Sequence, residues 1–440
     1  MEDPRILSQS ILNEFFESNK SLNNITAAAA SSGNLDTNAV QRTLALSRDV
    51  VRWKGRLDYW IDSVLDRPIA KLDGKLKILL RSAAFELLMD DKVPDYAAID
   101  SWVKIARQSI GEKVTGITNA VLRSLSNMDP SKPLNDSLSD RQLADWLSFP
   151  HWLVEKWIAS HGKDTAISIC NALNEPYRHT VRIYPKSLST DEIISQCSND
   201  GIQFDPIDSS ERFFIVTSGF SALKKHELFL TGHISVQDRA AGLAVELLDP
   251  KPGETVLDVC AAPGTKAVYL AERMQGTGKI LASDSNPKRA ALGQNDLERH
   301  GFSIIDWSVR DAAADTFETA DAILVDAPCT GTGVIGKHPD IKWRRTEKNV
   351  TEMADLQIRI LKHISDFVKP GGRLVYSTCS LEPEENWNVV DAFLKLNPSF
   401  TLEMNTDDMN TSWIDKHGTL QTLPQRDNLD GMYAAKMIRS

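Results

Sequence analysis

Beyond residue 231 the chain repeats one pattern: a short, almost wholly apolar run, a turn rich in glycine or proline, and a helical stretch. The clearest apolar runs cover 256–259, 280–283, 322–325 and 374–377. Strands buried on both faces are apolar throughout, and strands that alternate with helices form a parallel sheet covered on both sides. Residues 231–440 are therefore predicted to form a doubly wound α/β domain.

The region before residue 127 has a different periodicity. Apolar residues between 6 and 126 recur at spacings of three, four and seven, as in Leu76, Leu79 and Leu80. This spacing places them on one face of a helix. The stretch 27–38 interrupts the pattern with alanine, serine, glycine and asparagine, and we interpret it as a loop. An all-helical domain is predicted around it.

A polar stretch at 127–140 follows the helical region. It contains Pro130 and Pro133 and few apolar side chains, the composition of an exposed linker. Alternating stretches at 180–184 and 213–216 then flank a helical pattern, as in a small α/β module. The predicted organisation has consecutive parts: an all-helical domain at 1–130, a linker at 131–140, a small α/β module at 141–230 and the doubly wound domain at 231–440.

Composition limits the class of protein. No apolar run is long enough to span a bilayer and the N-terminal stretch lacks a secretory pattern, so we expect a cytoplasmic protein without membrane contact. The net charge of −10 gives no overall footprint for nucleic acid, so RNA contact would need local basic patches. The cysteines at 170, 197, 260, 329 and 379 form no C-x-x-C pair, which argues against a disulfide framework or a metal site.

Residues just after parallel strands line the edge where such sheets bind ligands. The first strand ends in CAAPGTK, where Gly264 lets the backbone pass close to a ligand. Asp284 ends the next strand and suits ribose hydroxyls, and Asp311 follows the third strand region as a partner for an adenine amino group. This turn has no G-x-G-x-x-G motif, which favours S-adenosylmethionine over a dinucleotide. The alternative is a simple strand-to-helix connection that binds no ligand, with Asp284 and Asp311 as helix N-caps.

Cys329 and Cys379 both lie just past a predicted strand, in AILVDAPCTGTG and RLVYSTCSLEPEEN. A lone cysteine is more often a small core residue, but two at matching positions on a ligand-binding edge indicate chemistry. A thiolate that adds to carbon 6 of cytosine makes carbon 5 able to accept a methyl group, and a second group assists loss of the carbon 5 proton. Asp326 is placed to hydrogen-bond the N3 and amino edge of the base.

These residues resemble the Sun-type RNA cytosine-5 methyltransferases. The resemblance rests on DAPC at 326–329, STCS at 377–380, the CAAPGTK turn and SVQDRAA at 235–241. It implies a Rossmann-like, S-adenosylmethionine-dependent domain in which Cys379 is the nucleophile and Cys329 assists product release. DNA cytosine methyltransferases use the Pro-Cys as nucleophile, so the presence of both favours RNA. The implied cofactor contacts are Cys260, Ala261, Ala262, Pro263, Gly264, Thr265, Lys266, Asp284, Asp311 and Asp326.

HPDIKW at 338–343 and the helical N-terminal region resemble the bacterial subgroup that modifies 16S ribosomal RNA at cytosine 967. In that subgroup the N-terminal domain is NusB-like, a helical fold associated with RNA. The resemblance implies 16S rRNA or a small-subunit particle as the partner, and we expect a monomer. A transfer RNA cytosine-5 methyltransferase and a non-catalytic RNA-binding assembly factor stay open as alternatives.

The segment 337–345 is basic and contains Trp343. Its cations would meet phosphates while the tryptophan stacks on an unpaired base, so we predict an RNA contact there. A solvated basic loop with a packing tryptophan is the alternative, and Lys266 either touches the substrate or only begins its helix. The cations of the segment are Lys337, Lys342, Arg344 and Arg345.

Overall fold

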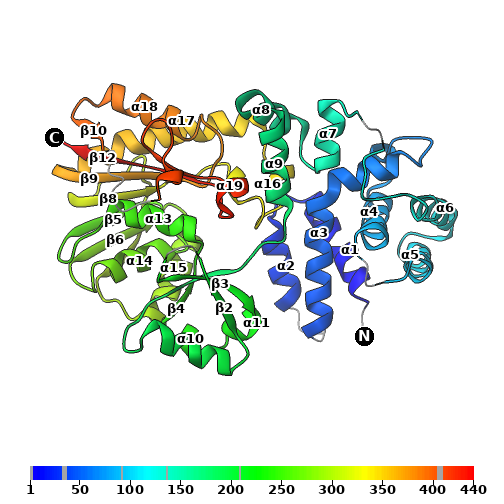
Figure 1. Ribbon diagram of the computed structural model, residues 1–440, viewed down its shortest axis with the longest axis horizontal. Helices are drawn as coiled ribbons and strands as arrows, with labels where there is room; N and C mark the ends of the chain where they lie inside the picture. The colour runs from blue at the N-terminus through cyan, green and yellow to red at the C-terminus, as the bar shows by residue number, and fades with distance from the viewer. Residues whose placement is uncertain (1–2, 32–36, 91–92, 135–136, 208–209, 404–409) are drawn as a thin grey trace. The chain divides into compact units, whose positions relative to one another are not determined.

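The computed structural model describes residues 3–31, 37–90, 93–134, 137–207, 210–403 and 410–440 (Figure 1). The chain divides into two compact units. The first unit consists of residues 1–174 together with the short segment 337–345. The second consists of residues 175–336 and 346–440.

The first unit is built from helices around an apolar core. Leu12, Trp60 and Trp102 are at most 1% exposed within it. None of the described helices is both long and apolar enough to cross a bilayer. The all-helical N-terminal region is confirmed. Its elements are α1 (Pro4–Glu17), α2 (Leu22–Ser31), α3 (Thr37–Asp62), η1 (Ile69–Lys71), α4 (Gly74–Leu88), α5 (Asp95–Ser109), η2 (Glu112–Val114), α6 (Thr115–Leu125), α7 (Asp140–Leu147), α8 (His151–His161), α9 (Lys163–Asn174) and α16 (Ile341–Arg344).

The loop predicted at 27–38 is wrong at both of its ends. Helix α2 continues to Ser31 and α3 begins at Thr37, while 32–36 lie outside the described residues. Residues 27–30 are all alanine, which has the highest helix propensity of any residue type. That preference outweighs the turn signal of the serine, glycine and asparagine that follow.

Helices α7 to α9 belong to the first unit, whereas the sequence analysis placed them in a module at 141–230. Trp146 of α7 packs edge-on against Tyr59 and Trp60 of α3, with ring centroids 6.2 and 6.1 Å apart. An amphipathic pattern shows that a helix has an apolar face but not which core covers that face. Packing therefore moves the division of the chain to Asn174.

The basic segment 337–345 belongs to this helical unit, which contradicts the RNA contacts predicted for Lys342 and Trp343. Lys342 is 1% exposed. Its ammonium donates to the carbonyls of Arg52 and Ser148 and to the side-chain oxygen of Asn174. Burial lowers the pKa of Lys342 well below its usual value. The donors of Lys342 are therefore all used inside the protein. The sequence could not show this, since a count of charges along the chain does not reveal buried acceptors.

Trp343 and Arg344 are engaged in the same unit. The indole N–H of Trp343 donates to the carbonyl of Val51 at 2.7 Å, and Lys54 lies over its ring. Arg344 lies over the ring of Phe15, 4.2 Å from its centroid. Trp343 is therefore a packing residue, as the alternative interpretation proposed, and not a platform for an RNA base.

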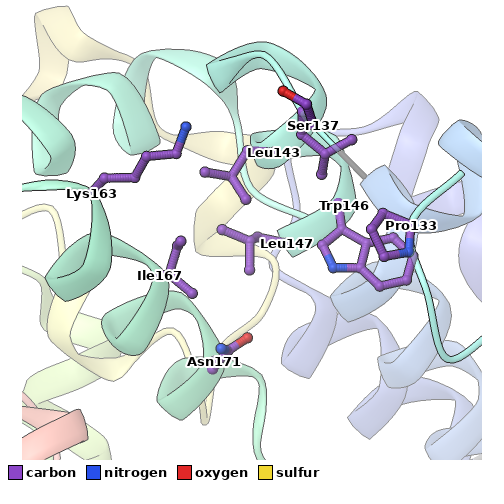
Figure 2. Close-up of a pocket in the computed structure, with 9 residues that line it drawn as sticks. Pro133, Ser137, Leu143, Trp146, Leu147, Lys163, Ile167 and Asn171 are labelled. Carbon is purple, nitrogen blue, oxygen red and sulfur yellow. The ribbon is translucent and has the colours of Figure 1, made fainter. Parts of the chain in front are cut away.

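Figure 2 shows a cavity of about 450 Å³ in the first unit, with apolar side chains from α7 and α9 on its walls. Leu143, Leu147 and Ile167 point into it, and Lys163 lies at its rim. The ammonium of Lys163 pairs with Asp140 at 3.0 Å. The cavity contains none of the predicted site residues.

The second unit begins with a small antiparallel sheet in the order β2-β3-β1-β4. Helix α10 covers it with Ile193 and Cys197, which share its apolar core. Its elements are β1 (Thr180–Ile183), α10 (Thr190–Asn199), β2 (Gln203–Pro206), β3 (Phe213–Ser218), α11 (Phe220–Leu223), α12 (Glu227–Leu230) and β4 (Ile234–Val236). The small α/β module and its two predicted strands are confirmed.

A buried ion pair joins the small sheet to the rest of the second unit. Arg182 of β1 makes two hydrogen bonds of 2.8 Å to Glu272, and both side chains are fully buried. Arg182 also lies 4.3 Å from the ring centroid of Tyr269. Removing one partner of such a pair leaves an uncompensated charge, which typically costs about 3–5 kcal/mol. The pair fixes the small sheet against α14.

The large sheet has the strand order β10-β12-β9-β8-β5-β6-β7, with β11 beside β12. The strands from β9 to β7 run parallel, and β12 is antiparallel to β9. Its elements are α13 (Arg239–Leu248), β5 (Thr255–Asp258), α14 (Thr265–Arg273), β6 (Lys279–Asp284), α15 (Pro287–His300), β7 (Ile305–Val309), β8 (Ala320–Asp326), η3 (Thr332–Val334), α17 (Glu347–Ile364), η4 (Ser365–Phe367), β9 (Val368–Thr378), α18 (Trp387–Leu396), β10 (Phe400–Leu402), η5 (Thr411–Trp413), β11 (Leu420–Thr422), α19 (Pro424–Asp427) and β12 (Met432–Arg439).

Helices cover both faces of this sheet, as the apolar strands require. Val256 packs with α13 and α14 on one face, and its neighbour Leu257 packs with α17 and α18 on the other. Figure 1 shows these pairs of helices on opposite sides of the strands. The predicted doubly wound, Rossmann-like domain is confirmed, with a C-terminal antiparallel strand that was not predicted.

Candidate active site

The two cysteine turns leave the sheet side by side. Strands β8 and β9 are parallel neighbours in which Asp326 pairs with Ser377, so the chain leaves both strands at the same edge. Cys329 Sγ lies 3.3 Å from Cys379 Sγ. Both side chains are half-buried. The structure therefore brings the two predicted cysteines into direct contact at the ligand-binding edge.

Hydrogen bonds that involve main-chain atoms hold the two turns in place. Gly333 N donates to the carbonyl of Cys379 at 2.9 Å. Leu381 N donates to Thr332 Oγ1 at 2.9 Å, and Gln357 Nε2 donates to the carbonyl of Pro328. These bonds come from three different segments, so the sulfur atoms are held by a rigid frame.

Asp326 and Lys266 form an ion pair beside the cysteines. The Lys266 ammonium lies 2.5 Å from Asp326 Oδ2, and Ser377 Oγ donates to Asp326 Oδ1. Burial is the largest influence on Lys266 and opposes its charged form, but the charge and hydrogen bond of Asp326, together with Cys379 and Asp258, outweigh burial and raise the pKa of Lys266. The Asp326 side chain is one-third exposed, so its carboxylate pairs with Lys266 and is also accessible at the open edge of the sheet. Lys266 thus does more than begin α14.

The predicted cofactor turn, residues 260–266, joins β5 to α14. Ala261 N donates to the carbonyl of Ser283, which holds the turn against β6. Gly264 has a φ of +105° and its N–H donates to Ala261. Burial, followed by the nearby carboxylates, raises the pKa of the Cys260 thiol. This third thiol is therefore held in its protonated form.

Asp258, which the sequence analysis did not single out, lies directly before the predicted cofactor turn. It ends β5, is fully buried, and neither of its oxygens has a hydrogen-bond partner among the described residues. Burial and the carboxylates of Asp326 and Asp284 raise its pKa to about 8. A buried acceptor without a donor is rare in a folded protein and marks a place for a ligand. The signal in the sequence was an acid that ends a buried strand.

Asp284 and Asp311 differ in their surroundings. Asp284 is 4% exposed and lies 3.5 Å from Arg289, which also donates to the carbonyl of Ala262 in the cofactor turn. Asp284 Oδ1 accepts from Asn286 N. Asp311 is exposed and accepts from the backbone of its own turn, at Ala313 N. The structure thus links Asp284 to the cofactor turn through Arg289, which no sequence pattern singled out.

Comparisons with known proteins match family models to three parts of the chain. A family model described as 16S rRNA methyltransferase RsmB/F matches residues 245–438. A NusB family model matches 3–127, and a model of the ferredoxin-like domain of RsmF/B-like methyltransferases matches 149–221. The probable ribosomal RNA small subunit methyltransferase B of Bacillus subtilis is 34% identical over 391 residues, or 87% of this chain and 86% of that protein. The chain belongs to the RsmB/F family of ribosomal RNA methyltransferases.

Other relatives support full-length similarity. Ribosomal RNA small subunit methyltransferase B of Erwinia tasmaniensis is 30% identical over 100% of this chain and 99% of that protein. The crystal structure of PH0851 matches 99% of both chains with a TM-score of 0.81 and 27% identity. A methyltransferase homolog from Pyrococcus horikoshii matches 69% of this chain with a TM-score of 0.61 and 28% identity.

As a member of the RsmB/F family, the protein is an S-adenosylmethionine-dependent methyltransferase that acts on RNA. The residues around the cofactor turn fit this donor. Asp258 offers a buried acceptor without a partner, and Gly264 keeps the turn free of a side chain. An acceptor of this kind suits the ribose hydroxyls and amino groups of the donor.

Gly264→Ala is expected to weaken binding of S-adenosylmethionine and to cost about 1–3 kcal/mol of stability. A φ of +105° strains any L side chain, and the added Cβ would lie 3.0 Å from the Trp307 ring and 3.2 Å from Gly293 Cα. Calorimetric titration with the donor and urea unfolding measure the two effects. Gly301→Ala is the matched control, since its φ is +70° but nothing lies within 4 Å of the added Cβ. Equal donor binding by both variants would contradict the prediction.

Proposed function

We propose that this family member methylates carbon 5 of a cytosine in 16S ribosomal RNA through a bond between Cys379 and carbon 6. One observation carries the proposal: two half-buried sulfur atoms lie 3.3 Å apart at the sheet edge, next to the turn that suits the methyl donor. Two neighbouring thiols suit a reaction that needs one nucleophile and one further proton-transfer group.

The residues divide the reaction between them. The Cys379 thiolate bonds to carbon 6, and the electron pair of the 5,6 double bond moves to carbon 5. S-adenosylmethionine supplies an electrophilic methyl group when bound. The carbon 5 proton then passes to a base at the open edge, the double bond re-forms, and the bond from carbon 6 to Cys379 breaks, while the S–H of Cys329 assists release of the departing thiolate. Asp326 holds the N3 and amino edge of the base, since its carboxylate faces the open edge beside Lys266.

Donor binding falls to the neighbouring turn. Under this proposal, residues 260–266 and Asp284 line the donor site together with Asp258, and Arg289 braces the turn from α15. Asp311 follows β7, the neighbour of β6, and its exposed carboxylate would contact the adenine amino group. The substrate assignment to 16S rRNA is supported by the description of the family model, the names of the relatives and the NusB match at 3–127. The position, cytosine 967, rests on the resemblance carried by HPDIKW at 338–343 and by the helical N-terminal region.

A doubly labelled assay tests the site of methylation. A 16S rRNA transcript with tritium on carbon 5 of its cytosines is incubated with methyl-labelled S-adenosylmethionine. We expect one tritium released to water for each methyl group transferred, because only carbon 5 methylation displaces that hydrogen. A transcript with uracil in place of cytosine 967 is the matched control and should accept no methyl group.

Each other outcome contradicts part of the proposal. Methyl transfer without tritium release would exclude carbon 5, and transfer to the uracil transcript would exclude position 967. Faster transfer to transfer RNA would favour the alternative substrate. Absence of transfer to any RNA, including small-subunit particles, would favour a non-catalytic assembly factor.

A further inference from the structure

A charged side chain from the segment after Cys379 contacts the turn that contains Cys329. Glu385 is fully buried and its carboxylate receives both donors of Thr330, the residue that follows Cys329. Thr330 N donates to Glu385 Oε1 at 2.8 Å, and Thr330 Oγ1 donates to Oε2 at 2.6 Å. Both carboxylate oxygens accept, which is the pattern of the ionised form. Burial raises the pKa of Glu385, whereas its hydrogen bonds with Thr330, Ser380 and Gln357 favour the ionised form, which places a negative charge next to the Cys329 turn.

The neighbouring residue holds the other turn with a neutral group. Asn386 Oδ1 accepts from Thr378 Oγ1 at 2.6 Å, and its Nδ2 donates to the carbonyl of Ser380 at 2.9 Å. Thr378 and Ser380 flank Cys379. The two turns are thus braced by adjacent residues that differ in charge: Asn386 holds the residues on both sides of Cys379, while Glu385 holds Thr330 beside Cys329 and also interacts with Ser380.

The remaining charged and titratable neighbours strengthen this difference. The positive charge of Lys266 interacts with Cys379, whereas the neighbours of Cys329 are Cys379 itself, Glu385 and the buried phenol of Tyr376. The hydrogen bond with Cys379, then burial and the charges of Cys379 and Glu385, raise the pKa of Cys329 well above its usual value. A positive neighbour favours a thiolate and a negative one opposes it.

We propose that Glu385 keeps the proton on Cys329 and thereby makes Cys379 the thiolate of the pair. Glu385 is a positioning residue in this scheme, since it acts through Thr330 and through its charge and does not touch the substrate. The retained S–H of Cys329 can donate across the 3.3 Å contact to the Cys379 sulfur. The inference rests on the proposed function, because it explains why one of two adjacent thiols attacks the base.

The test measures thiol ionisation directly. Full-length protein carrying Cys379→Ser is alkylated with iodoacetamide over a range of pH, and the modified peptide of Cys329 is quantified by mass spectrometry. We expect a midpoint above that of the same protein unfolded in urea. Adding Glu385→Gln should lower the midpoint by about one pH unit or more, since it removes a negative charge and keeps the shape of the side chain. Cys379 is absent from both chains, so its own influence cancels.

Glu352→Gln is the matched control. It removes the same charge from an exposed side chain of α17 that pairs with Lys348, and it should leave the Cys329 midpoint unchanged. A Glu385→Gln midpoint equal to that of its parent would overturn the proposal. If Glu385→Gln does not fold, the parent still decides the matter, because a folded midpoint at or below the unfolded one would also overturn it.

The assay separates this inference from the proposed function. Alkylation needs neither RNA nor methyl donor, so its result stands whether or not carbon 5 is the methylated atom. A normal rate of methylation by a Cys379→Ala variant would reject the proposed function and leave the Cys329 midpoint as measured. If Glu385→Gln leaves the Cys329 midpoint unchanged while Cys379→Ala is inactive in methylation, only the role of Glu385 is rejected.

Discussion

Cys379→Ala is expected to abolish methyl transfer, with a fall of at least about 10⁴-fold in turnover. The methyl side chain cannot bond to carbon 6, so carbon 5 stays too weak a nucleophile to accept the methyl group. Transfer of labelled methyl groups to 16S rRNA measures the loss. Donor binding by the variant should stay normal, because Cys379 lies outside the 260–266 turn.

Cys197→Ala is the matched control for that experiment. Cys197 is fully buried in the core of the small sheet, so its loss tests the general cost of removing a thiol. We expect this variant to keep its turnover while melting at a slightly lower temperature. Turnover of Cys379→Ala equal to that of the wild type would reject Cys379 as the nucleophile.

Cys329→Ala is expected to trap the enzyme on its substrate. With no thiol 3.3 Å from the nucleophilic sulfur, the departing Cys379 thiolate loses its proton donor, so its release slows and the bond between Cys379 and carbon 6 persists. Turnover should fall by about 10²–10⁴-fold, the usual contribution of a proton-transfer group. A protein band that migrates slowly on a denaturing gel, and disappears after ribonuclease treatment, measures the adduct.

The doubly substituted chain completes this prediction. Cys329→Ala combined with Cys379→Ala should give no adduct, since the bond-forming sulfur is gone. Free turnover by Cys329→Ala without any retarded band would show that release of Cys379 does not depend on Cys329.

Sheet rules were enough to predict that the two cysteines lie on the same edge of the sheet. Cys329 and Cys379 follow strands of the same parallel sheet, and the carboxyl ends of such strands share one edge. The strands themselves were visible because each is short and apolar on both faces. The order of β8 and β9 as direct neighbours was not visible, and it is this adjacency that brings the sulfur atoms to 3.3 Å.

Other parts of the site depend on contacts that no local pattern records. Arg289 and Glu385 are ordinary charged residues in the sequence, and their roles come from side chains that they meet across the fold. Lys342 shows the opposite error. A basic residue in a polar segment favours a solvent-exposed loop, whereas three buried acceptors from separate segments of the chain receive its ammonium.

The path of the chain through segment 337–345 limits how the protein can be divided. The polypeptide leaves the catalytic part after Gly336, completes the packing of the helical part, and returns at Thr346. A fragment that starts at Glu175 would keep Lys342 but lose every acceptor that its ammonium uses. The helical part made alone would lack one of its own helices, α16. Any fusion, truncation or exchange of parts with a relative therefore has to keep segment 337–345 together with residues 1–174.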